Sequence, residues 1–86
     1  MMLSSKPTRT LAAIFENPVR ADIRWADIET LLRALGADIK QGSGSRVRVT
    51  LSDRHMNIHV PHPQPTIFKD GVRSVRRFLI EAGVSR

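Results

Sequence analysis

The chain has 86 residues, which suits one compact domain and leaves no room for two. Fourteen lysines and arginines against eight acidic residues give a net charge of +6, and the half from residue 40 to residue 86 carries all of the excess. A basic field on one half of a small chain indicates a polyanionic partner: nucleic acid first, an acidic protein second and an anionic membrane third.

Cysteine is absent, which excludes a disulfide framework and thiolate chemistry and fits a reducing cytosol. The first residues lack the long apolar run of a signal peptide, and no stretch is long enough to span a bilayer. We therefore expect a cytoplasmic protein that has no membrane partner.

Two helices are predicted in the first half of the chain. Residues 8–15 form a short one, with Thr8 as its N-cap, and residues 1–7 before it are expected to be a flexible N-terminus. The second helix, over residues 25–35, is predicted because apolar side chains recur at the spacing of a helical stripe. These are Ile28, Leu31, Leu32 and Leu35.

Three strands are predicted in the middle of the chain. Residues 37–41 form a short strand, residues 46–51 alternate strictly between apolar and polar side chains, and the same alternation continues to residue 60. The inward positions are Val47, Val49, Leu51, Met56, Ile58 and Val60. The polar face holds Arg46, Arg48, Thr50, Asn57 and His59.

Matching the apolar faces predicts the pairing of the last two strands. It places Leu51 opposite Met56 and Arg48 opposite His59, with residues 52–55 as the turn.

A proline-rich connector, residues 61–65, precedes the last predicted helix, which runs from Gly71 to Ala82. The buried side of this helix is apolar, and its other side is basic. The basic side chains are Arg73, Arg76 and Arg77. The elements sum to α–α–β–β–β–α, an α+β fold whose three-stranded antiparallel sheet has helices on one face and leaves the other face free.

Residues 22–84 resemble a known family. The resemblance depends on the order and the spacing of four short segments. They are Ala34-Leu35-Gly36, Gly44-Ser45, Pro61-His62 and Gly71-Val72-Arg73-Ser74-Val75. They are similar to the HicA family of small bacterial toxins. The resemblance implies a double-stranded-RNA-binding-like fold, α-β-β-β-α, with an extra short N-terminal helix, in a single domain over residues 8–86.

The resemblance also implies an activity and partners. HicA-like toxins belong to type II toxin-antitoxin systems, and they are mRNA interferases, that is, endoribonucleases that bind and cleave mRNA. Each is held inactive by a HicB antitoxin. For this chain the resemblance implies a metal-independent hydrolase without a cofactor, with RNA and a HicB-like antitoxin as its partners.

One position departs from the family. The family pattern is Gly-Ser-His, with the histidine catalytic, and here the third position is Arg46. Arginine stays protonated and is a poor base, but it binds phosphate through two parallel hydrogen bonds. We therefore predict that Arg46 binds RNA, together with the other arginines of the basic half. The predicted RNA-binding residues are Arg46, Arg48, Arg73, Arg76 and Arg77.

Two histidines remain as candidates for proton transfer. His59 is predicted on the same face as Arg46, and His62 matches a family position in the connector. The alternatives are a solvated polar residue for His59, a turn residue for His62, and solvated charge for the arginines.

Residues four apart on an extended strand lie about 13 Å from each other, so we predict no histidine metal site. With no tyrosine and three phenylalanines, we expect recognition of RNA backbone and shape over base stacking.

Three functions compete. The first is an endoribonuclease with altered catalysis. The second is an inactive relative that binds RNA or the antitoxin, with salt-sensitive binding and no cleavage. The third is a basic surface that serves an acidic protein alone.

Overall fold

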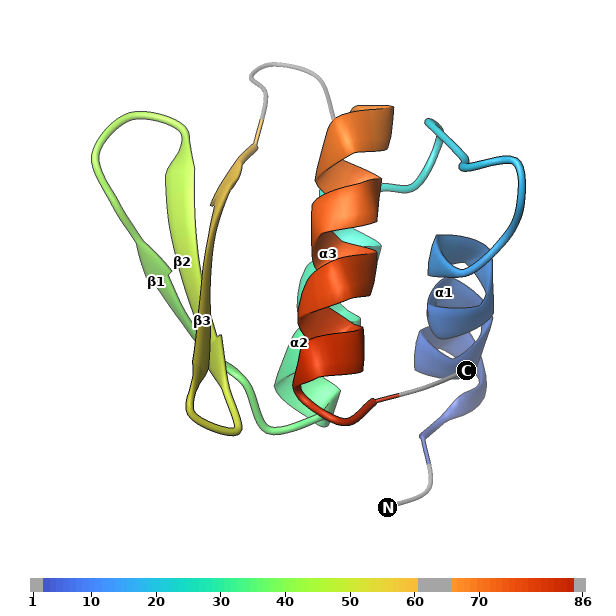
Figure 1. Cartoon of the computed structure of the whole chain (residues 1–86), viewed down its shortest axis with the longest axis horizontal. Helices are drawn as coiled ribbons and strands as arrows, with labels where there is room; N and C mark the ends of the chain where they lie inside the picture. Colours follow the sequence, from blue (N-terminus) through green and yellow to red (C-terminus); the bar gives the residue numbers. More distant parts are fainter. Residues whose placement is uncertain (1–2, 61–65, 85–86) are drawn as a thin grey trace.

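The computed structural model describes residues 3–60 and 66–84, and it confirms the predicted α+β fold of the double-stranded-RNA-binding-like type (Figure 1). The elements are α1 (Ser5–Ile14), α2 (Trp25–Ala34), β1 (Asp38–Gln41), β2 (Arg46–Leu51), β3 (Arg54–His59) and α3 (Lys69–Glu81). The predicted connector at residues 61–65, with His62, lies outside the described residues.

The three strands form an antiparallel sheet in the order β1-β2-β3. Helices α2 and α3 cover one face of this sheet, and α1 packs against both helices on the side away from the sheet (Figure 1). Within residues 3–60 and 66–84, no helix covers the other face of the sheet, which is open. No helix of the described residues combines the length and apolar character needed to cross a membrane.

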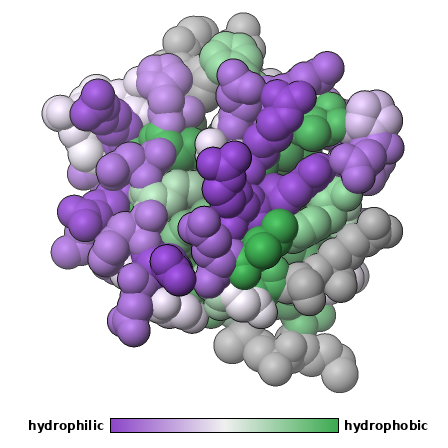
Figure 2. Space-filling view, in the orientation of Figure 1, coloured by the Kyte–Doolittle hydropathy of each residue, from purple (hydrophilic) through white to green (hydrophobic). Residues whose placement is uncertain are grey.

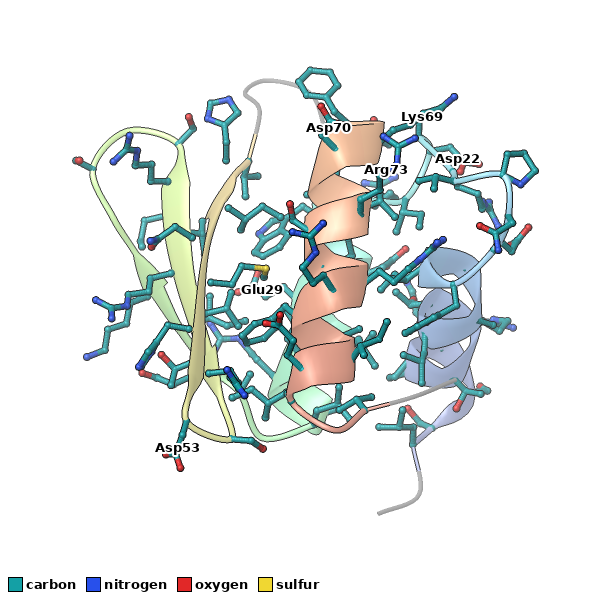
Figure 3. All side chains as sticks on the ribbon, in the orientation of Figure 1. Asp22, Glu29, Asp53, Lys69, Asp70 and Arg73 are labelled. Atoms are coloured by element: carbon teal, nitrogen blue, oxygen red, sulfur yellow. The ribbon has the colours of Figure 1, made fainter. Side chains whose placement is uncertain are left out.

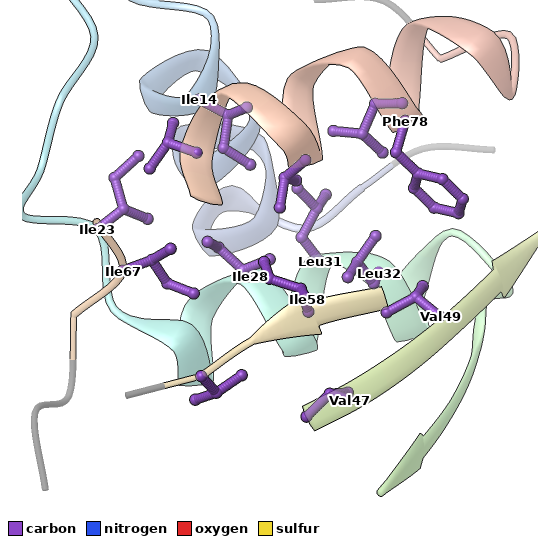
Figure 4. Packing of buried hydrophobic residues seen from close by; sticks show 14 of the residues in the cluster. Ile14, Ile23, Ile28, Leu31, Leu32, Val47, Val49, Ile58, Ile67 and Phe78 are labelled. Atoms are coloured by element: carbon purple, nitrogen blue, oxygen red, sulfur yellow. The ribbon is translucent and has the colours of Figure 1, made fainter. Parts of the chain in front are cut away.

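The core lies between the sheet and the helices, where the alternation of β2 meets the apolar stripes of α2 and α3 (Figure 4). Val49, Leu31, Leu32 and Leu79 are fully buried. Burying one such side chain stabilises the fold by about 1.5–3 kcal/mol before the entropic cost of ordering it. The faces of β2, α2 and α3 that were predicted to point inward are therefore the faces that are buried in the structure.

Helix α1 begins at Ser5 and not at Thr8, so the predicted N-cap is wrong. Ser4 is the N-cap residue, with extended backbone, and the Thr8 hydroxyl instead donates a hydrogen bond to the Ser4 carbonyl oxygen at 2.9 Å. Pro7 falls in the first helical turn, where its missing N–H costs no intrahelical hydrogen bond. A proline near the start of the helix is thus compatible with an earlier beginning.

The β2–β3 pairing differs from the predicted one by two residues. Arg46 pairs with His59, and Arg48 pairs with Asn57. The turn contains only Ser52 and Asp53. Both have positive φ, 50° and 64°, as in the tight hairpin turns whose twist matches that of the flanking strands. A slip of two residues leaves every side chain on its predicted face, so matching the apolar faces could not detect it.

Because this turn holds two non-glycine residues in the left-handed region, a better turn sequence is expected to stabilise the fold. Replacing Ser52→Asn and Asp53→Gly together should raise the free energy of unfolding by about 1 kcal/mol. Urea denaturation followed by circular dichroism measures this change. A decrease in stability would mean that the turn is not the two-residue turn described here.

Candidate nucleic-acid interface

The open face of the sheet, called the outer face below, is polar along all three strands. Alternation along each strand and the observed pairing assign its side chains. They are Asp38 and Lys40 from β1, Arg46, Arg48 and Thr50 from β2, and His55, Asn57 and His59 from β3. Thr50 is half-buried, and the others are exposed.

Arg46 and His59 are direct neighbours across the two strands. The next pair along the ladder is hydrogen-bonded, since the Val60 N–H donates to the Ser45 carbonyl oxygen at 2.8 Å. Arg46 and His59 therefore occupy a non-hydrogen-bonded position, where facing Cα atoms are about 4.5 Å apart and the side chains lie closest. A guanidinium and an imidazole are thus held side by side on the outer face.

The imidazole of His59 is held by a serine hydroxyl. Ser45 Oγ lies 2.9 Å from His59 Nδ1, within hydrogen-bond distance. This contact orients the ring, and Nε2 makes no hydrogen bond to any residue that the structure describes. If the hydroxyl donates to Nδ1, Nε2 carries the proton and can act as an acid; if Nδ1–H donates to the hydroxyl, Nε2 has a free lone pair and can act as a base.

The sequence indicates Ser45 only through the Gly44-Ser45 pair of the family spacing, which does not predict its contact with His59. Gly44 precedes it with a φ of +64°, a conformation that glycine adopts without strain. This bend leads the chain into β2 with Ser45 directly before the strand. The correct hairpin pairing, read from a two-residue turn, would have placed Ser45 near His59.

His55 repeats this arrangement at the other end of the hairpin. Its Nδ1 lies 3.0 Å from Thr50 Oγ1, and the two residues are paired across the strands. This end is next to the turn that contains Asp53 (Figure 3). The residue opposite His55 is a threonine, whereas the residue opposite His59 is an arginine. His55 is therefore a matched comparison for His59.

A groove of about 360 Å³ runs between the edge strand β3 and the first turns of α3. Its polar and aromatic lining consists of Asn57, His59, Phe68, Asp70 and Ser74. Figure 3 shows Asp70 at the end of α3 from which the chain leads back to β3. A second concavity, on the outer face, is lined by Arg46, Asn57, Ile58 and His59. His59 and Asn57 therefore border both hollows.

The cations of the outer face have few carboxylates to pair with, because most acidic side chains form ion pairs elsewhere. Arg20 binds Glu16 and Asp22, and its hydrogen bonds hold the pKa of the Asp22 carboxyl below its ordinary value. Two further pairs join Lys6 to Asp27 and Arg33 to Glu29. Within residues 3–60 and 66–84, no ion pair involves Lys40, Arg46 or Arg48. The outer face carries the cations Lys40, Arg46 and Arg48 and the single carboxylate of Asp38, so it presents net positive charge to a ligand.

The three arginines of α3 lie apart from this surface, because α3 is on the covered side of the sheet (Figure 1). Arg73 binds Asp70 at 2.9 Å. Arg77 is exposed and makes no hydrogen bond or ion pair with the described residues. The α3 face that Figure 2 shows is mostly hydrophilic, with small separate apolar areas.

Arg76 is engaged inside the protein. Its guanidinium donates hydrogen bonds to the carbonyl oxygens of Ile14 at 2.9 Å and Glu16 at 2.7 Å, and to Asn17 Oδ1 at 3.3 Å. It also lies 5.8 Å from the ring centre of Phe15. Carbonyl groups at the end of α1 lack helical partners, so this cation satisfies them and complements the negative end of the helix dipole.

The order α-α-β-β-β-α, with a three-stranded antiparallel sheet and helices on one of its faces, places the chain in the double-stranded-RNA-binding-like class of folds. A family model described as "HicA toxin of bacterial toxin-antitoxin" matches residues 25–84, more than half of the chain. The chain therefore belongs to the HicA family of toxins, which act with a cognate antitoxin and bind RNA. Helix α1 lies outside the matched residues. Searches of curated proteins and of solved structures gave no match.

Because Arg76 holds the end of α1, its loss is expected to destabilise the fold. Arg76→Met should lower the free energy of unfolding by about 1–3 kcal/mol, since several hydrogen bonds from a charged donor are lost. Arg77→Met, which removes the same group from the adjacent exposed position, should change it by less than about 0.5 kcal/mol. Urea denaturation of the two variants measures the difference, and equal stabilities would contradict the assigned role of Arg76.

Proposed function

We propose that the chain is an mRNA interferase that binds mRNA on the outer face and cleaves it at the His59 end of that face. One observation supports this most directly: an imidazole fixed by Ser45 stands next to an arginine on an open surface of unpaired cations. Arg46 and Arg48 supply phosphate contacts, and His59 supplies the group for proton transfer.

Cleavage of RNA without an external nucleophile needs two proton transfers. A base takes the proton of the ribose 2′-hydroxyl, the 2′-oxygen attacks the adjacent phosphorus, and the bond to the 5′-oxygen breaks as an acid protonates that oxygen. The products carry a 2′,3′-cyclic phosphate and a 5′-hydroxyl. We assign one transfer to Nε2 of His59 and the stabilisation of the charged phosphorus centre to Arg46.

The second transfer is assigned to His62 on the strength of the family resemblance, because Pro61-His62 matches a family position. His62 lies outside the described residues, so its variant is an independent arm of the experiment. We further propose a cytoplasmic protein with a HicB-like antitoxin as its protein partner. An acidic antitoxin surface would compete with RNA for the cations of the outer face.

The alternative function is an inactive relative that holds RNA or the antitoxin. The observation that favours it is Arg46 at the third position of Gly44-Ser45-Arg46, where the family pattern has its catalytic histidine. The variant Arg46→His separates the two functions. It should raise cleavage if the chain is an inactive relative, and lower it if Arg46 holds the phosphate for His59.

We expect cleavage to depend on His59 and not on His55. Purified protein, free of antitoxin, is incubated with labelled mRNA in the presence of a metal chelator. His59→Ala should reduce the rate by about 100-fold or more, because general acid–base catalysis contributes factors of this size. His55→Ala, which removes the matched imidazole at the other end of the hairpin, should leave the rate within about threefold of the original.

His62→Ala is tested in the same assay, and a loss similar to that of His59→Ala would assign the second proton transfer. A 2′-O-methyl RNA of the same sequence should stay intact, because it has no 2′-hydroxyl proton to remove. Equal losses in His55→Ala and His59→Ala would contradict the proposed site. Binding without cleavage in every sample would establish the inactive alternative.

Binding should depend on salt through Arg46 and Arg48. For single-stranded RNA, each lost phosphate contact should reduce the slope of log K against log salt concentration by about 0.7. We expect Arg46→Ala and Arg48→Ala each to show this reduction in fluorescence anisotropy titrations at several salt concentrations. Arg33→Ala removes an arginine that pairs with Glu29 on α2, and it should keep the original slope. An unchanged slope for both outer-face variants would place RNA elsewhere.

A further inference from the structure

An aromatic ring stands exposed at the rim of the β3–α3 groove. Phe68 is the residue directly before α3, and 58% of its surface is accessible. Among the described residues, the only large apolar side chains exposed to this degree are Phe68 and Ile80. A ligand that covered this ring would gain the free energy of burying its apolar surface.

The groove combines this ring with groups that form hydrogen bonds. Asn57 and Ser74 border it, and their side chains make no hydrogen bond within the described part of the chain. The Asp70 carboxylate, which pairs with Arg73, is largely exposed. A hydroxyl and a carboxylate beside an aromatic ring match what an unstacked nucleobase requires: a face to stack on and partners for its edge. A hollow of about 360 Å³ is at the lower end of ordinary ligand sites.

The groove also meets the proposed cleavage site. His59 lines both the groove with Phe68 and the concavity with Arg46 on the outer face. A phosphate bound at Arg46 and a base in the groove would therefore both lie next to His59. This is the arrangement expected for neighbouring parts of the same strand of RNA.

We propose that Phe68 stacks on a nucleobase of single-stranded RNA, next to the phosphate held at Arg46 and His59, with Asp70 and Ser74 facing the edge of that base. The proposal rests on the proposed function and adds its substrate class, because a base in a duplex is stacked on its neighbours and is not free to enter the groove. It differs from the expectation of pure backbone recognition, since one exposed ring at the right place is sufficient for one base.

The test measures binding of 2′-O-methyl single-stranded oligonucleotides, which resist cleavage, by fluorescence anisotropy. Phe68→Leu keeps an apolar side chain and removes the ring, and it should weaken binding by about 10-fold, within the range for loss of one stacked base. Phe68→Trp should restore binding to at least the original affinity. Ile80→Ala, which changes the other exposed apolar side chain, should bind as the original protein does.

An oligonucleotide of the same length with abasic residues gives the second comparison. The original protein should bind it about as weakly as Phe68→Leu binds the complete strand, and Phe68→Leu should lose little further affinity. If Phe68→Leu binds the complete strand as well as the original protein does, or if the original protein does not distinguish the two strands, base stacking is wrong and RNA binding stands. If the original protein binds neither strand, the proposed function fails as well.

Discussion

The two-residue turn at Ser52 and Asp53 determines which side chains of β2 and β3 face each other. With this turn, Arg46 lies opposite His59 and Ser45 comes within 2.9 Å of the imidazole. A turn longer by two residues would put Arg48 opposite His59 and would move Ser45 along the ladder, away from the ring. The apolar core would be nearly unchanged, because side chains two positions apart share a face. Local turn geometry, more than the core, therefore sets the candidate site.

The distribution of ion pairs separates arginines that hold the fold from arginines that face solvent. Arg20 pairs with the carboxylates of Glu16 and Asp22 in the connection after α1, and Arg76 binds main-chain carbonyl groups at the end of α1. Their charges are used within the protein. On the outer face no acidic partner binds Arg46 or Arg48 within the described residues. The positions of the unpaired arginines thus say more about where a polyanion can bind than the net charge of the chain does.

The sequence was sufficient for features that depend on short-range periodicity. The bounds of β2, the buried stripes of α2 and α3, and the polar character of the outer face follow from alternation or from helical spacing, and the structure confirms them. Features that join distant residues were not predictable in the same way. The contact between Arg76 and Ile14 spans 62 positions, and nothing in the local sequence of α3 separates Arg76 from its neighbour Arg77.

The candidate site contains features that local periodicity predicts and features that depend on contacts between distant residues. Arg46 and His59 were predicted on one face from alternation alone, but their direct pairing depends on φ angles in the turn, for which Ser-Asp is a weak signal compared with Asn-Gly. The role of Ser45 depends in turn on that pairing. Phe68 was unremarkable as one of three phenylalanines, and only its exposure beside His59 distinguishes it from the buried Phe78.

The arginine at the third position of the family pattern changes which strand carries the proton-transfer chemistry in the proposed mechanism. A guanidinium remains protonated at physiological pH, so it cannot take the 2′-hydroxyl proton, and a base has to come from another residue. The cross-strand neighbour of Arg46 is His59, at the position where side chains of paired strands come closest. An imidazole at this position can reach a phosphate bound by Arg46. The same patch of the sheet would then keep both a cation and an imidazole, with the imidazole supplied by β3 instead of β2.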